Sequence, residues 1–248
     1  MSETTAGSLL GGKVCYRQPR EGFRSGIEPV LLAAAVPARA GEKALEAGTG
    51  AGAGLLCLAA RVPGIAGTGV EKDPLLAALA RENLAANGVS AITILEADIE
   101  TFENGERFAH SFANPPWHEQ AGTPPSHPAR MSAKRGGARL ASWIGAMARR
   151  TLPGGSLTLI LPAARAADAL QAAAMSGCGG MTLFPFWPRS GSPAKLILLR
   201  AIRGSRSPFR MLAGLVLHKP DGRFTDEAEG ILRDGAPIAL DGRIHTRI

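Results

Sequence analysis

The chain has 248 residues, of which 45% are hydrophobic and 20% charged, a balance typical of a globular protein rather than a disordered one. Its 28 lysines and arginines outnumber its 21 acidic residues, and the formal net charge of +7 favours a polyanionic partner such as a nucleic acid. The sequence has no pattern of a secretory signal, a membrane span or a cysteine framework, so we expect a cytoplasmic protein without a bound metal.

From residue 43 onward, short apolar runs alternate with helix-like stretches, the pattern of a mostly parallel sheet with helices on both faces. Helices are expected at about residues 53–61 and from Asp73-Pro74, an N-cap with a first-turn proline, to the stop signal Asn87-Gly88. No linker divides the sequence, so we expect a single domain, residues 43–248, on which residues 1–42 pack. The expected strands are Lys43–Ala47, Gly67–Glu71, Ala91–Ala97, His110–Ala113, Ser156–Leu161, Met181–Phe186 and Lys195–Ala201.

Two segments lie outside this alternation. Residues 1–42 combine basic positions with a short helix-like run, Glu28–Val36, and residues 118–139 are expected to form a loop rich in proline, glycine and basic residues. One segment precedes the first strand and the other follows the fourth, so we expect both at the carboxyl edge of the sheet. Their candidate RNA-binding residues are Lys13, Arg17, Arg20, Arg24, Arg130, Lys134, Arg135 and Arg139.

A glycine-rich turn closes the first expected strand and opens the first helix. Glycine suits this place because the backbone bends sharply and a ligand can approach without meeting Cβ atoms. The spacing also fits dinucleotide-binding folds, so the turn alone does not identify its ligand. A carboxylate two residues before the first glycine would repel phosphate but could receive the cationic amino-acid end of S-adenosylmethionine. The candidate cofactor-binding residues of the turn are Glu46, Gly48, Thr49, Gly50 and Gly52.

Two further acids follow expected strands. Glu71 ends the second strand about 20 residues past the glycines, where a carboxylate can accept both hydroxyls of a ribose. Asp98 follows the third strand and is placed to accept a hydrogen bond from the adenine amine of the cofactor. Glu71 would serve NAD equally well, and either acid alone could be a solvent-facing charge at a strand end. The neighbouring Lys72 and Ile99 complete this group of cofactor-binding candidates.

The segment Asn114-Pro115-Pro116-Trp117 follows the fourth expected strand, so it emerges at the carboxyl edge, where ligands of open α/β folds bind. Taken alone, such a segment is usually a rigid turn with an aromatic plug. The side-chain carbonyl of Asn114 and the backbone carbonyl of Pro115 can, however, accept the two hydrogens of a planar amine on a purine. Trp117 offers a face on which the base can stack. These four residues are the candidate catalytic residues.

Together, these motifs resemble a class I S-adenosylmethionine-dependent methyltransferase of the small-domain type, and more closely the tRNA1(Val) (adenine(37)-N6)-methyltransferase family. The resemblance implies a Rossmann-like, mostly parallel seven-stranded sheet with an antiparallel last strand, and methyl transfer to adenine N6 of a valine tRNA. The family usually carries tyrosine in place of Trp117, and often aspartate in place of Glu28, a further candidate for binding the cofactor. Three more stretches carry the match: Gln18–Leu32, Leu140–Leu157 and the tail from Pro208 to Arg233.

Three alternatives remain open on the sequence. A protein glutamine-N5 methyltransferase uses a similar turn, but such enzymes usually have an N-terminal helical domain that 42 residues cannot supply. An rRNA guanine-N2 methyltransferase also fits the Asn-Pro-Pro-aromatic segment, although those proteins are commonly longer. A non-catalytic RNA-binding module that kept the fold is the third, and the intact glycines and acids argue against it. The sequence does not determine the oligomeric state.

Overall fold

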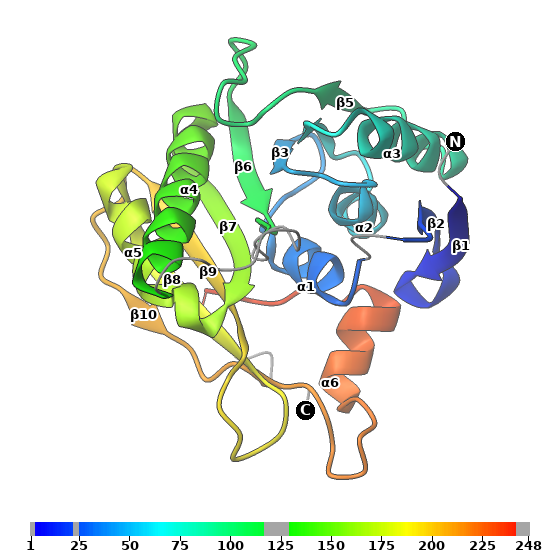
Figure 1. Cartoon of the computed structure of the whole chain (residues 1–248). Coiled ribbons are helices and arrows are strands. Elements are labelled where there is room, and N and C mark those ends of the chain that lie inside the picture. Colours follow the sequence, from blue (N-terminus) through cyan, green and yellow to red (C-terminus); the bar gives the residue numbers. More distant parts are fainter. Residues whose placement is uncertain (1–2, 22–24, 117–128, 242–248) are drawn as a thin grey trace.

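The computed structural model describes residues 3–21, 25–116 and 129–241, with the backbone only for residues 129–136 and 138. Within these ranges, the central sheet has nine strands in the order β10-β8-β9-β7-β6-β3-β4-β5, and β11 lies beside β8 (Figure 1). The strands are β3 (Lys43–Ala47), β4 (Ala66–Glu71), β5 (Ile92–Glu96), β6 (Phe108–Ala113), β7 (Thr151–Pro162), β8 (Cys178–Trp187), β9 (Leu196–Arg203), β10 (Arg210–Met211) and β11 (Leu215–Val216).

The direction of the strands confirms the expected fold class. β9 is antiparallel to both of its neighbours, β7 and β8, and every other pair in this sheet is parallel. The seven long strands therefore form the mostly parallel sheet with an antiparallel last strand that the sequence predicts. The two-residue strands β10 and β11 extend it along β8 and were not expected.

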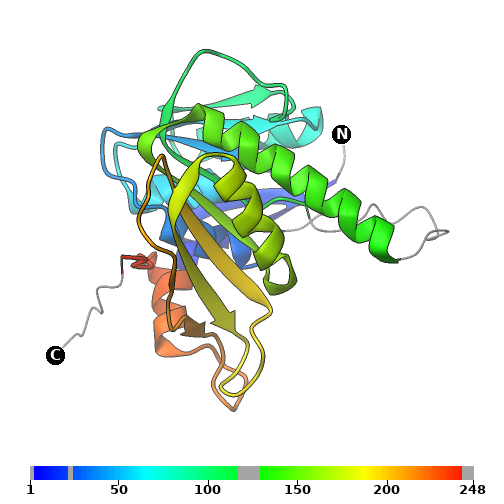
Figure 2. The same ribbon diagram turned by 90° about the vertical axis from the view of Figure 1, so that its left-hand side faces the viewer.

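Helices cover both faces of the sheet, as expected (Figures 1 and 2). One apolar core joins the sheet to α1 (Glu28–Ala35), α2 (Ala53–Arg61) and α3 (Pro74–Ala86), and the other joins it to α4 (Ala129–Arg150) and α5 (Ala166–Met175). Successive residues of a strand face opposite sides, so Ala44 lies in the first core and Leu45 in the second. Near the C-terminus, α6 (Asp226–Glu229) and the π-helical turn η3 (Gly230–Asp234) also contact the first core.

Helix α1 is apolar on nearly every side, and its C-terminal end is held by two partly buried arginines. Arg61 donates hydrogen bonds to the carbonyls of Ala33, at 3.0 Å, and of Val36, and Arg200 donates to the carbonyl of Ala35. Burial lowers the pKa of Arg200 to about 10, so it still carries its charge at neutral pH. A cation is favourable at this position because the C-terminal end of a helix carries partial negative charge.

The expectation of a loop over residues 118–139 is wrong from residue 129 onward, because α4 begins at Ala129. Adjacent Gly136 and Gly137 lower the helix propensity by about 1 kcal/mol each, which hides the helix in the sequence. Leu140, Ile144 and Met147 in its second half are buried at helical spacing and stabilise it through packing. Figure 2 shows the first half of α4 extending beyond the sheet. Residues 118–128 lie outside the described ranges.

An N-terminal hairpin was also not expected. The strands β1 (Thr4–Leu9) and β2 (Val14–Pro19) pair antiparallel, joined by the short helix η1 (Leu10–Gly12). Alternation of buried Val14 and Tyr16 with exposed residues is the signal that could have revealed β2. Leu10 is buried despite a φ of +50°, and it contacts the same core as η3. The hairpin is therefore packed against the remainder of the chain.

None of the helices in residues 3–21, 25–116 and 129–241 is long and apolar enough to cross a membrane. Over the same ranges, no cluster of histidine, cysteine, aspartate and glutamate side chains could hold a metal ion.

Candidate active site

The glycine-rich turn joins β3 to α2 at the carboxyl edge of the sheet. Gly48, Gly50 and Gly52 have φ angles of +66°, +56° and +89°, which only glycine adopts without strain. A Cβ added to Gly48 would lie 2.6 Å from the ring of Trp143 on α4, so this glycine is also needed for packing. A Cβ added to Gly50 would meet no atom within 4 Å. The turn thus presents Gly50 to open space, where a ligand can approach its backbone.

Glu46 lies beneath this turn with only 4% of its surface exposed. Its Oε2 atom accepts hydrogen bonds from the Thr49 hydroxyl, at 2.5 Å, and from the backbone N–H of Leu55, at 3.1 Å. Burial, with a smaller contribution from the nearby charge of Glu71, raises the pKa of Glu46 to about 8 in spite of these two hydrogen bonds. Glu46 thus fixes the turn to the first residues of α2. Its contact with a cofactor stays a prediction.

The raised pKa of Glu46 predicts how stability depends on pH. In the unfolded chain this carboxyl ionises near its ordinary pKa of 4.5, whereas in the folded chain it stays protonated up to about pH 8. Folded protein therefore holds the proton more tightly, and the free energy of unfolding should fall between these two pH values, by at most about 1.4 kcal/mol per pH unit. Glu46→Gln keeps the shape and cannot ionise, so its denaturation midpoints should change less over this range. Parallel pH profiles of the two proteins would contradict the assignment.

The ends of β4 and β5 meet the same turn. Glu71 is buried and accepts hydrogen bonds from the backbone N–H groups of Gly50, at 2.8 Å, and Asp73, at 2.9 Å. Its own backbone carbonyl accepts the N–H of Ala97, at 3.0 Å, which brings the end of β5 alongside. Asp98 is exposed and accepts the N–H of Glu100, at 2.9 Å. Of the remaining candidates here, Lys72 is exposed and Ile99 is buried.

The candidate catalytic segment begins beside the glycine-rich turn. Ala113 of β6 pairs with Ala47 of β3, so the residues that follow this pair, Asn114 and Gly48, leave the sheet side by side. Asn114 is partly buried, and its carboxamide forms no hydrogen bond with any described residue. After it, Pro115 is buried and Pro116 is exposed, while Trp117 lies outside the described ranges. The structure therefore places an amide acceptor, without a partner among the described residues, next to a turn that is open to a ligand.

The candidate residues of the N-terminal segment occupy different environments. Glu28 is the first residue of α1 and is partly buried. Lys13 donates to the carbonyl of Asp234 at 2.9 Å, and Arg20 pairs with Glu3 at 2.6 Å, so both side chains have partners within the chain.

The other basic candidates lie on β2, on α4 or outside the described ranges. Arg17 and Arg139 are exposed. Arg130, Lys134 and Arg135 belong to the first half of α4, where the backbone alone is described, and Arg24 lies outside the described ranges.

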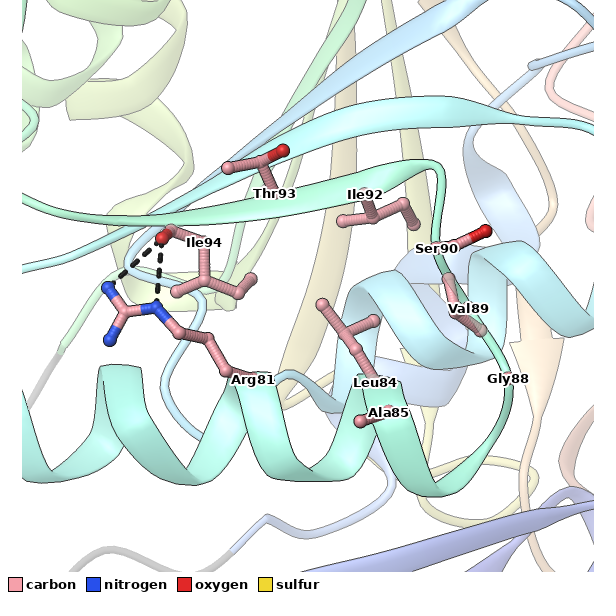
Figure 3. A pocket seen from close by; sticks show the side chains of 9 residues that line it. All are labelled: Arg81, Leu84, Ala85, Gly88, Val89, Ser90, Ile92, Thr93 and Ile94. Carbon is pink, nitrogen blue, oxygen red and sulfur yellow. Dashed lines mark hydrogen bonds between the residues drawn. The ribbon is translucent and has the colours of Figure 1, made fainter.

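A pocket of about 460 Å³ lies away from the glycine-rich turn, between α3 and the edge strand β5 (Figure 3). Arg81 closes one side of it and donates from Nε and a terminal nitrogen to the carbonyl of Ile94, at 3.2 and 3.0 Å. None of the candidate catalytic or cofactor-binding residues lines this pocket. We therefore place the candidate active site at the glycine-rich turn and Asn114.

Comparisons with known proteins show the family of this chain. Residues 28–140, which include α1, the turn and Asn114, match the family model described as methyltransferase small domain. A curated tRNA1(Val) (adenine(37)-N6)-methyltransferase from Aeromonas hydrophila is 30% identical over 207 residues, which cover 82% of this chain and 86% of that protein.

Solved structures share the fold. A predicted O-methyltransferase from Agrobacterium tumefaciens matches with a TM-score of 0.72 at 26% identity, covering 86% of this chain and 98% of that one. A 16S rRNA methyltransferase from T. thermophilus, in complex with AdoMet and guanosine, shares the fold with a TM-score of 0.55 at 18% identity, over 81% of this chain and 50% of that one. The chain therefore belongs to the methyltransferase small domain family and is an S-adenosylmethionine-dependent N-methyltransferase.

Proposed function

We propose that this enzyme methylates the exocyclic N6 amine of an adenine in tRNA, at position 37 of a valine tRNA, in the cytoplasm. The carboxamide of Asn114 beside the glycine-rich turn carries this proposal, because it is an acceptor without a partner among the described residues. The curated relatives that share 30% to 32% identity with this chain are named for that reaction.

The residues of the turn are suited to S-adenosylmethionine. Gly50 leaves open space above its backbone, and the carboxylate of Glu71 accepts the N–H of Gly50 at 2.8 Å, which supports Glu71 as the acceptor for a ribose. We assign cofactor binding to the turn, Glu71, Asp98 and their neighbours, with Glu28 at the start of α1. When bound, this cofactor supplies a methyl group on a positively charged sulfur.

Asn114 and Pro115 would prepare the nitrogen that receives the methyl group. The amine of adenine is planar because its lone pair is delocalised into the ring, so it is a weak nucleophile. The Oδ1 atom of Asn114 and the backbone carbonyl of Pro115 accept its two hydrogens, which shifts electron density onto the nitrogen. The nitrogen held by Asn114 and Pro115 would then accept the methyl group that the cofactor supplies, and one of the amine protons would be released to solvent. Trp117 would stack on the base, and positioning would supply much of the rate enhancement.

We also propose that the basic residues hold the tRNA through its phosphates. RNA affinity should then fall linearly with salt on a double-logarithmic plot, with a slope of roughly −0.7 to −0.9 per contacted phosphate. Replacing Lys134, Arg135 and Arg139 together by alanine should weaken RNA binding, flatten the slope by about one unit per lost contact, and leave cofactor affinity unchanged.

The control for this prediction is Arg206→Ala. Arg206 is exposed and follows β9, whose C-terminal end lies at the opposite, amino edge of the parallel strands. For Arg206→Ala, we expect the slope of RNA affinity against salt concentration to match that of the unmodified enzyme. An unchanged slope in the triple variant would mean that the excess positive charge reflects composition rather than RNA binding.

Nucleoside mass spectrometry of tRNA from a strain that lacks the enzyme tests the proposed reaction. N6-methyladenosine should disappear from the valine tRNA and return when the gene is restored. Loss of a methylated guanine from rRNA would instead support a guanine-N2 enzyme. Loss of a methylated glutamine from protein would support a protein glutamine-N5 methyltransferase.

A further inference from the structure

Asn83 of α3 and Asn87, which caps the C-terminal end of α3, form hydrogen bonds with the backbone of β2. Asn87 accepts the N–H of Cys15 at 2.9 Å and donates to its carbonyl at 2.7 Å. One helical turn earlier, Asn83 accepts the N–H of Arg17 at 2.9 Å and donates to its carbonyl at 2.8 Å. Alternate residues of a strand direct their backbone groups to the same edge, so the two side-chain amides satisfy one edge of β2.

Asn83 has an additional partner in the glycine-rich turn. Its Nδ2 atom also donates to the carbonyl of Ala51, at 2.9 Å, between Gly50 and Gly52. Asn83 is 2% exposed, so this hydrogen bond is formed away from water, where an unpaired carbonyl would be costly. Ala80 of the same helix lies against Gly52, since an added Cβ there would be 3.4 Å from it. Helix α3 thus supports the turn at two adjacent residues.

The strand held by Asn83 also reaches the segment that leads into α1. The Tyr16 hydroxyl is 2.9 Å from the Ser25 hydroxyl, and the N–H of Ser25 donates to the side chain of Gln18 at 3.0 Å. Ser25 precedes Glu28 by three residues. The hairpin therefore connects two parts of the proposed cofactor site, namely the turn through Asn83 and the approach to α1 through Ser25.

We propose that Asn83 is a positioning residue for the cofactor site, which holds the carbonyl of Ala51 and locks the glycine-rich turn to the N-terminal hairpin. The inference rests on the proposed binding of S-adenosylmethionine at this turn. Asn83 acts through the backbone of the turn. Small displacements in the support of a binding site are enough to lower affinity markedly.

Asn87 provides a matched control. Its side chain also makes three hydrogen bonds, two to β2 and one to the carbonyl of Asn83, at 2.8 Å, but none to the turn. Asn83→Ala should lower the affinity for S-adenosylmethionine in calorimetry by about tenfold, whereas Asn87→Ala should stay within about twofold of the unmodified enzyme. Asn83→Asp should lose at least as much as Asn83→Ala, because it sets a carboxylate against the carbonyl oxygens of Arg17 and Ala51.

Two further readouts separate positioning from general destabilisation. In Asn83→Ala, the KM for the cofactor should rise while kcat at saturating cofactor stays within about threefold. Amide hydrogen exchange without ligand should accelerate over residues 48–55 in Asn83→Ala but not in Asn87→Ala, while residues 14–19 accelerate in both. If Asn83→Ala does not fold, Asn83→Ser, which keeps a small polar group, replaces it in each measurement.

Equal losses of cofactor affinity in the two alanine variants, or exchange over residues 48–55 that is unchanged in Asn83→Ala, would overturn the inference. Failure of the proposed tRNA reaction is a separate outcome, because it would change the methylated product and not the cofactor affinities of these variants relative to one another. The exchange experiment needs no ligand, so it decides the role of Asn83 in holding the turn in either case.

Discussion

Gly50→Val should abolish measurable binding of S-adenosylmethionine, with a loss of affinity of at least about 100-fold, or about 2.7 kcal/mol. Gly50 has a φ of +56°, and its added side chain would enter the open space above the turn. A β-branched residue in this conformation is strained by about 1–3 kcal/mol, and relief of that strain would move the N–H that donates to Glu71. Calorimetry on the folded variant measures the effect.

Gly105→Val is the control for backbone strain. Gly105 has a φ of +73° and an equally open Cβ position, but it precedes β6 at the opposite end of the strand from Asn114. It should lose comparable stability and keep its cofactor affinity. Near-normal affinity in Gly50→Val would show that the cofactor does not approach the turn at Gly50.

Asn114→Ala should lower turnover by about 10²–10³ while cofactor affinity stays close to that of the unmodified enzyme, the scale expected for removing one preorganised contact to the transition state. The side chain is partly buried and unpaired among the described residues, so its removal breaks no hydrogen bond of the described fold. Single-turnover methylation of tRNA at saturating cofactor measures the change.

Asn114→Asp is the informative companion variant. It keeps an oxygen that can accept a hydrogen from the amine, so it should retain more activity than Asn114→Ala. A turnover within a few-fold of normal in Asn114→Ala would make Asn114 a structural turn residue and would contradict the proposed mechanism.

The central sheet could be predicted because each strand is marked by residues that are close together in the sequence. Buried parallel strands produce apolar runs, and the turn residues between them mark their ends, so β4 at Ala66–Glu71 lies within one residue of its expected position. β7 departs furthest from its expected bounds, since it begins at Thr151 and includes the Pro153-Gly154-Gly155 stretch expected as a turn. The ladder between β6 and β7 shifts register there, which lets the strand accommodate these residues.

The site was predictable only in part, because several of its contacts join residues that are distant in sequence. The glycines and the acids at strand ends follow from strand boundaries. No local pattern shows that Trp143 lies against Gly48, or that Asn83 reaches Ala51 and Arg17. Helical spacing over residues 140–147 could have suggested that Trp143 is buried, whereas Asn83 carries no comparable signal in the sequence.

Methylation of an unmodified valine tRNA transcript by the purified enzyme tests the central claim most directly. With S-adenosylmethionine as the donor, nucleoside mass spectrometry of the product should show N6-methyladenosine. The signal should disappear when adenine 37 of the transcript is replaced by guanine, and it should form far more slowly with Asn114→Ala. Methylation of guanine, or no methylation of the transcript by an enzyme that binds the cofactor, would contradict the assignment of adenine N6 in tRNA as the substrate.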